Sequence, residues 1–573
     1  MASEDVLQPP VQDAVPVPSA RPDAHTQKFD RQLRLWAAAG QAALETAHVL
    51  VVSGNATAAS TLKNLVLPNV GHFTVLDPAL VDESDIGANF FLDPSSLGKP
   101  RASEVVKFLL ELNSDVQGHA LVQPLSSLSD LSPYSLILAI DVESPSDLLA
   151  LSDAAWEQGI PLIKVESCGF YGTLRTQVKE LTVVETHPES IVDLRLSHPF
   201  PALVEHAHSY DYATMDSAAH SHVPAVVILI KALEEWKAAH DGRGPTGTKE
   251  RKEFMDGVAA LKRQSDEENF DEAVTLFRRA GTKPGIPSEI QALFDDPACE
   301  NVSSSSSNFW LLLHAVRSFV SHPSNPSRLL PLPGALPDMK ASSAGYVALQ
   351  QLYKAQARAD LALVRALVAE TLARVGLDRG AVGDDEVETF VKHAAWLKVV
   401  RGRSLREELE SCALKGQIGS ILSSASFQQP PDQSLHIYAA LRACSRFYTT
   451  HARYPGAPAP SSAQEEGAQD ASLEWERDAD ELAGLARELV RGWSEGEKLA
   501  EVGVDEEQWK EDLAKVCKEV ARAPPSTTLP QTAALLGGLV AQEAIKLVTR
   551  QYVPLEGTCV WDGVRSGTGI VRA

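Results

Sequence analysis

The six residues Ser53-Gly54-Asn55-Ala56-Thr57-Ala58 lie where a nucleotide-binding fold has its phosphate loop. They follow an apolar run and precede a helical pattern, the context in which G-x-G-x-x-G binds phosphates. In one register Ser53, Asn55 and Ala58 replace the three glycines; in the other only Gly54 survives. Both registers lack the middle glycine, which lets the backbone approach phosphates at a helix N-terminus. We predict a scaffold with a degenerate nucleotide site, with weak nucleotide binding as the alternative.

The thiols are a second source of chemistry. The chain contains six cysteines, which are Cys168, Cys299, Cys412, Cys444, Cys517 and Cys559. No two of them form a C-x-x-C pair, so the spacing indicates neither a structural zinc site nor a dense disulfide framework. Acidic neighbours of Cys299 would raise the pKa of its thiol, which opposes nucleophilic chemistry. We predict that all six cysteines are structural, reduced and intracellular.

Four histidines form two H-x-H pairs, which could offer ligands to zinc. They are His206, His208, His220 and His222. No acid or thiolate completes an obvious set around them. We predict structural histidines and no bound metal.

The segments around the degenerate turn alternate between strand and helix patterns. Strands are expected at residues 48–52, 73–76, 136–140 and 161–165, and helices at 58–67, 102–112 and 148–156. This alternation predicts an α/β fold with a parallel sheet covered by helices on both faces.

The pattern changes after about residue 190 to long helical segments, including Tyr346 to Val375. We therefore predict an α/β domain interrupted by a large, mostly helical insertion. The expected parts are a disordered tail (1–27), the first part of the α/β domain (28–190), the insertion (191–515, with a disordered loop at 454–472) and a return segment (516–573). A strand-like run near Cys559 to Trp561 could complete the interrupted sheet.

The charge balance limits the classes of partner. A net charge of -24 and a pI near 5.1 argue against nucleic acid or an anionic membrane as the main partner. The longest near-apolar stretch, Ala533 to Ala541, is shorter than the roughly 20 residues that cross a bilayer, so no membrane span is expected. The first 27 residues lack the basic and apolar regions of a signal peptide.

Several segments are similar to signatures of one superfamily. They are Phe29 to Trp36 (FDRQLRLW), Leu62 to Leu65 (LKNL), Asn89 to Leu92 (NFFL) and Gly98 to Ala102 (GKPRA). Through them the chain resembles the ubiquitin-activating enzyme superfamily. The resemblance implies a Rossmann-like adenylation fold of the ThiF/MoeB type, interrupted by a region similar to a catalytic-cysteine domain without the cysteine.

Further segments narrow the resemblance to one subfamily. They are Glu111 to Val116, His198 to Pro201, Pro337 to Met339, Arg453 to Gly456 and the helix from Thr532 to Glu543. They resemble the regulatory subunits of neddylation activating enzymes, the amyloid precursor protein-binding protein one subfamily. The resemblance implies a heterodimer with a catalytic subunit that uses ATP and Mg²⁺, a ubiquitin-like modifier, transient contact with a conjugating enzyme, and a cytoplasmic and nuclear location.

Catalytically competent members have several charged groups around the nucleotide, and the resemblance implies that most are missing here. Asp77 and Asp141 are retained acids. Ala79 replaces the ribose-binding acid, Gly87-Ala88-Asn89 replaces an Asn-Arg-Gln cluster, and Arg101 replaces a lysine. An isolated acid does not organise magnesium and triphosphate, which need several converging charges. We therefore expect no functional cofactor site in this chain.

The resemblance implies one positive contribution to catalysis. Arg31 matches an arginine that the inactive half lends to the ATP of the other half, where a cation supplied in trans stabilises the triphosphate charge. The structural alternative is that Arg31 pairs with a local acid such as Asp30.

Two other classes of function stay open at this stage. One is a self-sufficient adenylyltransferase or a nucleotide-dependent oxidoreductase, both of which need an intact phosphate loop. The other is a scaffold or adaptor with no share in catalysis.

Overall fold

The computed structural model describes residues 22–187, 193–280, 285–410, 414–426, 428, 431–457, 471–494, 504–525 and 527–572. Within them the chain forms two compact units. The first unit takes in the described residues up to Gln177, from Ser404 to Thr549 and from Leu555 onward. The second unit takes in Val178 to Arg403 and Arg550 to Pro554.

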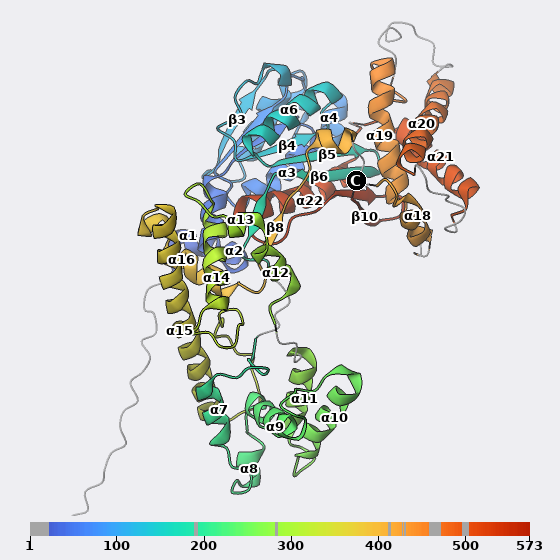
Figure 1. Cartoon of the computed structure of the whole chain (residues 1–573). Helices are drawn as coiled ribbons and strands as arrows, with labels where there is room; N and C mark the ends of the chain where they lie inside the picture. Colours follow the sequence, from blue (N-terminus) through green and yellow to red (C-terminus); the bar gives the residue numbers. More distant parts are fainter. Residues whose placement is uncertain are drawn as a thin grey trace, which may run out of the picture. The chain divides into compact units, whose positions relative to one another are not determined.

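An eight-stranded mixed sheet organises the first unit, with helices on both faces (Figure 1). Its order is β10-β9-β6-β5-β4-β1-β2-β3; β3, β2, β1, β4 and β5 run parallel, and β6, β9 and β10 pair antiparallel. The strands are β1 (His48–Val52), β2 (His72–Leu76), β3 (Gln117–Leu121), β4 (Leu136–Ile140), β5 (Leu162–Cys168), β6 (Tyr171–Gln177), β9 (Thr558–Asp562) and β10 (Gly567–Val571). The predicted α/β class and the return of the C-terminal segment to the sheet are confirmed.

The helices of the first unit come from both ends of the chain. They are α1 (Ala24–Lys28), α2 (Asp30–Thr46), α3 (Ala56–Val66), α4 (Glu83–Ala88), α5 (Arg101–Leu110), α6 (Pro145–Gln158), α17 (Leu405–Glu410), α18 (Ile418–Ser426), α19 (Ser434–His451), α20 (Ala471–Trp493), α21 (Glu506–Arg522) and α22 (Pro530–Thr549), with short 3₁₀ turns at Pro94–Ser96 and Leu125–Ser127.

Helix α22 is the apolar helix of the core. It packs against α3, α2 and strands β4 to β6, and half of its most apolar window is buried. With 20 residues it is long and apolar enough to cross a membrane by length and composition alone. The apolar stretch that the sequence analysis considered, Ala533 to Ala541, is only part of this helix. Packing inside the unit accounts for this composition.

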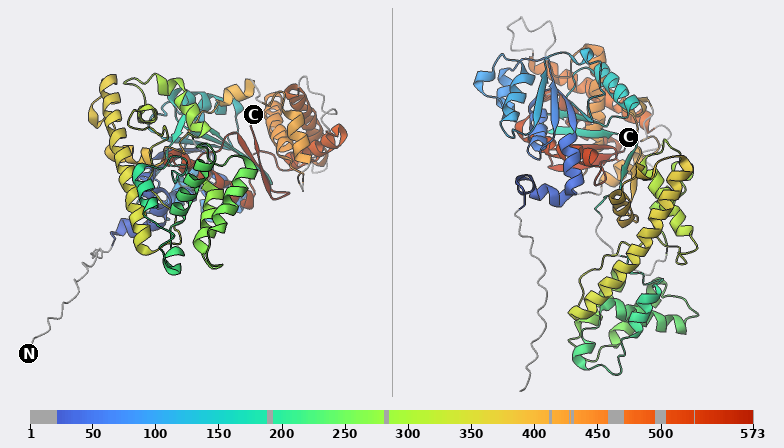
Figure 2. Two further views of the ribbon diagram at one scale, coloured as in Figure 1. Left: turned by 60° about the horizontal axis from the view of Figure 1, so that its bottom comes forward. Right: turned by 90° about the vertical axis from the view of Figure 1, so that its left-hand side faces the viewer.

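Helices α19, α20 and α21 differ most from the predicted boundaries, because they belong to the sheet unit and not to the insertion. They share one hydrophobic core with Tyr171 and Val560 of the sheet. Helix α19 packs against β9 and β10, and the three helices form one bundle in Figures 1 and 2. The buried ion pair between Arg175 of β6 and Glu408 of α17 fastens the start of this segment to the sheet. The region separate from the sheet is therefore 178–403, shorter than the predicted 191–515.

The second unit is mostly helical, as predicted, but also contains a two-stranded antiparallel sheet that the sequence did not reveal. The strands are β7 (Leu181–Val183) and β8 (Lys398–Val400). The helices are α7 (Pro201–His208), α8 (Ser217–His220), α9 (Ala225–Ala239), α10 (Gly247–Ala260), α11 (Glu268–Ala280), α12 (Ser288–Phe294), α13 (Pro297–Glu300), α14 (Asn308–Ser321), α15 (Ser343–Val375) and α16 (Asp384–Lys392), with a 3₁₀ turn at Arg379–Ala381.

The two predicted disordered segments fall largely on residues 1–21 and 458–470, outside the described residues. Parts of both predictions are wrong. Residues 24–27 are helical, because the Asp23 side chain caps α1 by accepting a hydrogen bond from the Thr26 N–H at 2.6 Å. Residues 471–472 open α20.

The close contact between α22 and α3 yields a prediction. A Cβ at Gly537 would lie 2.6 Å from the Ser60 Cβ and 2.8 Å from its backbone carbon, whereas a Cβ at Gly538 meets nothing within 4 Å. Gly537→Ala should destabilise the protein by about 1–2 kcal/mol, since overpacking outweighs the better helix propensity of alanine. Gly538→Ala is the matched control and should stabilise by up to about 1 kcal/mol. Urea unfolding of both variants measures the difference, and equal shifts would contradict the packing.

Candidate functional site

The degenerate turn binds its own side chains at the positions where a phosphate would bind. Ser53 adopts a left-handed backbone with φ of 82°, and Asn55 is the N-cap of α3. The Asn55 Oδ1 accepts a hydrogen bond from the Ala58 N–H at 3.0 Å. This N–H belongs to the first turn of the helix, whose amides would otherwise be available to an anion. The side chain of Asn55 therefore occupies part of the anion site.

Asp77, at the end of β2, binds groups of this chain. Its carboxylate accepts hydrogen bonds from the N–H of Gly54 at 2.7 Å and of Ala79 at 2.9 Å, and from Nε of Arg101 at 2.7 Å. A Cβ at position 54 would lie 3.2 Å from the Asp77 Oδ2. The surviving glycine thus lets the backbone approach a carboxylate of the protein itself.

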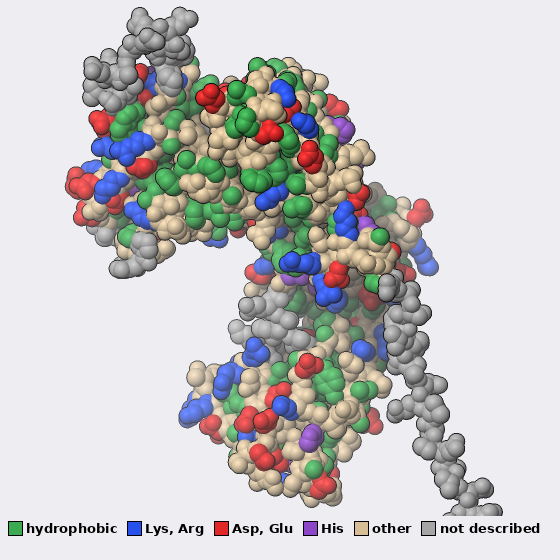
Figure 3. Space-filling view, turned by 180° about the vertical axis from the view of Figure 1, so that it is seen from behind, with side chains coloured by type: hydrophobic (Ala, Val, Ile, Leu, Met, Phe, Trp, Pro, Cys, Tyr) green, Lys and Arg blue, Asp and Glu red, His purple; other side chains and the backbone are tan. Residues whose placement is uncertain are grey.

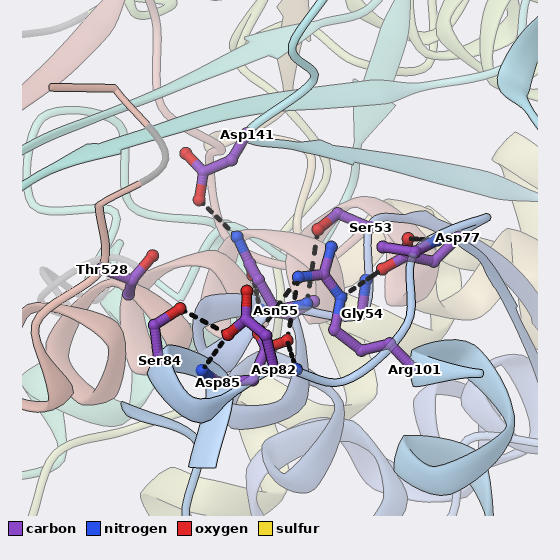
Figure 4. Close-up of polar contacts among 12 residues, drawn as sticks. Ser53, Gly54, Asn55, Asp77, Asp82, Ser84, Asp85, Arg101, Asp141 and Thr528 are labelled. Carbon is purple, nitrogen blue, oxygen red and sulfur yellow. Dashed lines mark hydrogen bonds and ion pairs between the residues drawn. The ribbon is translucent and has the colours of Figure 1, made fainter. Parts of the chain in front are cut away.

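Arg101, which the sequence analysis predicts at the position of a lysine, is held between two acids. Besides Asp77 it pairs with Asp85 of α4, Nη1 to Oδ1, at 3.0 Å (Figure 4). The side chains of Asp77 and Asp85 are 3% and 9% exposed, and that of Arg101 is 20% exposed. Burial opposes the charge of Arg101, but the two carboxylates together raise its pKa. The cation is therefore committed to an internal ion pair.

Asp141 follows β4 and is also satisfied internally. Its carboxylate accepts hydrogen bonds of 2.6 Å from the Ser167 N–H, the Ser167 hydroxyl and Nδ2 of Asn55. Ser167 in turn contacts the Thr528 hydroxyl at 3.1 Å, which ties the site to the segment before α22. Burial raises the pKa of Asp141 to about 6, against the opposing effect of these hydrogen bonds.

The segment Gly87-Ala88-Asn89, which the sequence analysis predicts at the position of the Asn-Arg-Gln cluster, turns its polar residue inward. Asn89 is 2% exposed, and its Oδ1 accepts a hydrogen bond from the Phe91 N–H at 3.1 Å. The next residue, Phe90, is 93% exposed. The segment therefore presents an apolar ring to solvent, a feature that the sequence analysis did not single out.

These contacts test whether the turn fits a nucleoside triphosphate with magnesium, and it does not. The cation at Arg101 is neutralised, and both retained acids are bound to groups of the protein. Among the described residues, no three His, Cys, Asp or Glu side chains form a group that could hold a metal ion. No step of a nucleotide reaction is therefore assigned to this chain's own site.

Arg31 is exposed on the first turn of α2. The local alternative of a pair with Asp30 is not formed, because Asp30 pairs with Arg34 at 3.1 Å. Among the residues that the structure places, Arg31 has no ion-pair partner. Its guanidinium is available for a contact outside the chain.

The described cysteines are buried or half-buried, and burial raises the pKa of each thiol. For Cys299 the pKa rises to about 12, and burial contributes more than the acidic neighbours that the sequence suggested. Cys412 lies outside the described residues.

The four histidines have separate roles. His208 pairs with Glu234 and His220 with the buried Glu267, each at 2.7 Å. His222 donates to the Ala218 carbonyl at 2.7 Å, and burial lowers the pKa of His206.

Comparison with known proteins agrees with this geometry. The model of the ThiF family matches residues 29–560, so the chain belongs to the ThiF family, the class that the sheet and its degenerate turn define. A solved structure of E. coli MccB with succinimide covers 26% of this chain and 48% of its own at 13% identity and a TM-score of 0.24, too low to support an inference.

Relatives in other organisms define the group within that class. The NEDD8-activating enzyme E1 regulatory subunit of Danio rerio is 36% identical over 94% of this chain and 97% of its own length. The regulatory subunit AXL of Arabidopsis thaliana is 34% identical over the same shares, and that of Saccharomyces cerevisiae is 28% identical over 64% and 78%. The chain belongs to this family of regulatory subunits.

Removing Arg101 should destabilise the first unit. Arg101→Gln leaves two buried carboxylates without their cation, so the free energy of unfolding should fall by on the order of 3 kcal/mol. The matched control is Arg34→Gln, which breaks a pair whose side chains are 77% and 52% exposed and should cost less than about 1 kcal/mol. Equal losses in urea unfolding would show that the buried pair is not a special contribution to stability.

Asp141 should give a pH dependence with a defined sign. Its folded pKa of about 6 lies above the ordinary value of 3.8, so protonation favours the folded state. The stabilisation is complete below about pH 4 and is lost as the pH rises through 6; it amounts to on the order of 3 kcal/mol. Asp141→Asn should therefore gain stability relative to the parent between pH 4 and pH 7, measured by urea unfolding. The exposed Glu157→Gln should show no such trend, and parallel pH profiles for Asp141→Asn and parent would refute the assignment.

Proposed function

We propose that this chain is the regulatory, non-catalytic subunit of an enzyme that activates the ubiquitin-like modifier of the neddylation pathway. A catalytic partner would hold ATP, magnesium and the thioester cysteine, adenylate the modifier's C-terminus and pass it to a conjugating enzyme. The observation that carries the proposal is the internally closed site, in which Arg101 pairs with Asp77 and Asp85 and Asn55 caps α3.

The surface of the first unit supports a role in assembly. Large hydrophobic side chains of this unit reach solvent, among them Leu35, Leu80, Phe90, Leu97 and Phe170. Figure 3 shows one face on which apolar side chains are frequent over this unit, with acidic and basic side chains interspersed. Such exposure is typical of a subunit that buries apolar surface against a partner.

Arg31 supports a share in catalysis beyond assembly. An unpaired, exposed arginine beside the start of α2 can reach a triphosphate in another subunit without first breaking an ion pair. A cation added in trans to the phosphates would make activation depend on assembly. This separates the proposal from a pure scaffold, and the closed site separates it from a self-sufficient adenylyltransferase.

Mixing experiments test the role of Arg31. Arg31→Ala should leave the heterodimer intact by size-exclusion chromatography and reduce modifier-dependent pyrophosphate exchange on the order of 10-fold or more, because the triphosphate loses a cation. Arg358→Ala, an exposed arginine of α15, is the control and should keep most of the rate. The chain without its partner should show no exchange.

Two results would contradict the proposal. Pyrophosphate exchange by the isolated chain would show that its own site is competent. Unchanged exchange by the Arg31→Ala heterodimer would remove Arg31 from the mechanism and favour the scaffold.

A further inference from the structure

The second unit contains a polar cleft that the proposed function does not use. Helices α14 and α15 pack against each other, and a cleft with a volume of about 410 Å³ lies along them. Its size is within the range of small-molecule sites. The lining residues that matter here are His314, Ser318, His322, Glu370, Thr371 and Arg374.

Arg374 presents an unneutralised guanidinium at this cleft. Its Nη2 lies 2.8 Å from Nε2 of His314, whose Nδ1 lies 2.8 Å from the Cys299 carbonyl. A carbonyl only accepts, so the imidazole proton is on Nδ1 and Nε2 accepts from the guanidinium. In the described part of the chain, no carboxylate lies within ion-pair distance of Arg374. The cation is oriented by a neutral ring and keeps free N–H groups.

Glu370 is an exposed acid of the same cleft, and it too has no ion-pair partner among the described residues. It precedes Arg374 by four residues, the spacing and order in which an acid and a base usually pair on a helix. The contact with His314 holds Arg374 away from that pairing. The C-terminus of α15 interacts favourably with a cation, which accounts for an arginine in its last turn. It does not account for the separation of Glu370 from Arg374.

The neutral groups of the cleft have defined hydrogen-bond directions. The hydroxyl of Ser318 donates to the His314 carbonyl at 3.0 Å, and that of Thr371 to the Leu367 carbonyl at 2.8 Å. These protons are used, so the two oxygens offer only lone pairs to a ligand. His322 Nδ1 accepts from the Ser324 N–H at 3.2 Å, which places a donor at Nε2.

We propose that the α14–α15 cleft binds a small anion that also carries hydroxyl groups, of the sugar-phosphate class. The phosphate contacts the free N–H groups of Arg374 and the Nε2–H of His322, since a guanidinium matches phosphate geometry. The hydroxyls donate to Ser318, Thr371 and the carboxylate of Glu370. A plain anion would gain the same cation but face the repulsion of Glu370.

Isothermal titration of the full chain tests the site with glucose 6-phosphate, and with glucose and inorganic phosphate as its two halves. Glucose 6-phosphate should bind with a Kd at or below about 1 mM, and each half more weakly. Arg374→Gln should weaken binding of glucose 6-phosphate at least 10-fold. Arg358→Gln, an exposed arginine on the same helix outside the cleft, should not change it.

One further variant, Glu370→Gln, should have opposite effects on the binding of glucose 6-phosphate and of inorganic phosphate. Glu370→Gln should weaken glucose 6-phosphate about threefold or more, because an acceptor for a hydroxyl is lost, and should strengthen inorganic phosphate, because a repulsion is lost. If Glu370→Gln strengthens both ligands, the cleft is a simple anion site and the proposal fails. It also fails if no ligand binds in the millimolar range, or if Arg374→Gln binds glucose 6-phosphate as the parent does.

Discussion

The ion pair of Arg101 with Asp77 and Asp85 is the interaction on which the character of the first unit depends. In a nucleotide-binding fold, cations and amides at the carboxyl ends of the strands stay free for phosphates, at a cost in stability that the ligand repays. Here the Asp77 carboxylate accepts hydrogen bonds from both the Gly54 N–H and the Arg101 guanidinium, and Asn55 accepts one from the Ala58 N–H in the first turn of α3. At this edge of the sheet the donors therefore bind groups of the protein itself.

The sequence predicted the sheet well where local pattern and burial agree. The expected strands at 48–52 and 136–140 are β1 and β4, because both are short apolar runs in the centre of a parallel sheet. The sequence analysis did not predict β3 or β6. The residues of β3 are at most partly buried at the sheet edge, and β6 contains Arg175, a residue type usually found at the surface although it is buried here. The acid that neutralises Arg175 is Glu408, more than two hundred residues away in sequence, so no local pattern could show it.

The candidate site also has features that the sequence predicts and features that only the structure shows. The loss of the glycines and the retention of Asp77 and Asp141 were visible in the sequence, because they are changes of residue type at fixed spacing. That Asn55 would cap α3 and bind Asp141 at once, or that Arg101 would meet Asp85, depends on contacts across the sheet ends. The predicted domain boundary was wrong for the same reason. Helices α19 to α21 have the same helical pattern as the insertion, and only their shared core with β9 and β10 assigns them to the sheet unit.

The closed site and Arg31 place their charges in opposite environments, one buried and paired, the other exposed and, among the described residues, unpaired. Arg101, Asp77 and Asp85 are paired with one another inside the first unit, so removing one member should leave a buried charge unpaired. Arg31 lies in the opposite environment, before a break in α2 where Trp36 and Ala37 leave helical geometry, with φ of 55° at Ala37. The Trp36 ring nitrogen donates to Gln41 Oε1 at 3.0 Å and holds the segment before the break to the rest of the helix.

Asp30, the acid next to Arg31 in sequence, pairs with Arg34, so the segment before the break presents the Arg31 cation without a counter-charge of its own. In the assembly we propose, Arg31 gains an electrostatic role when another subunit supplies the phosphates.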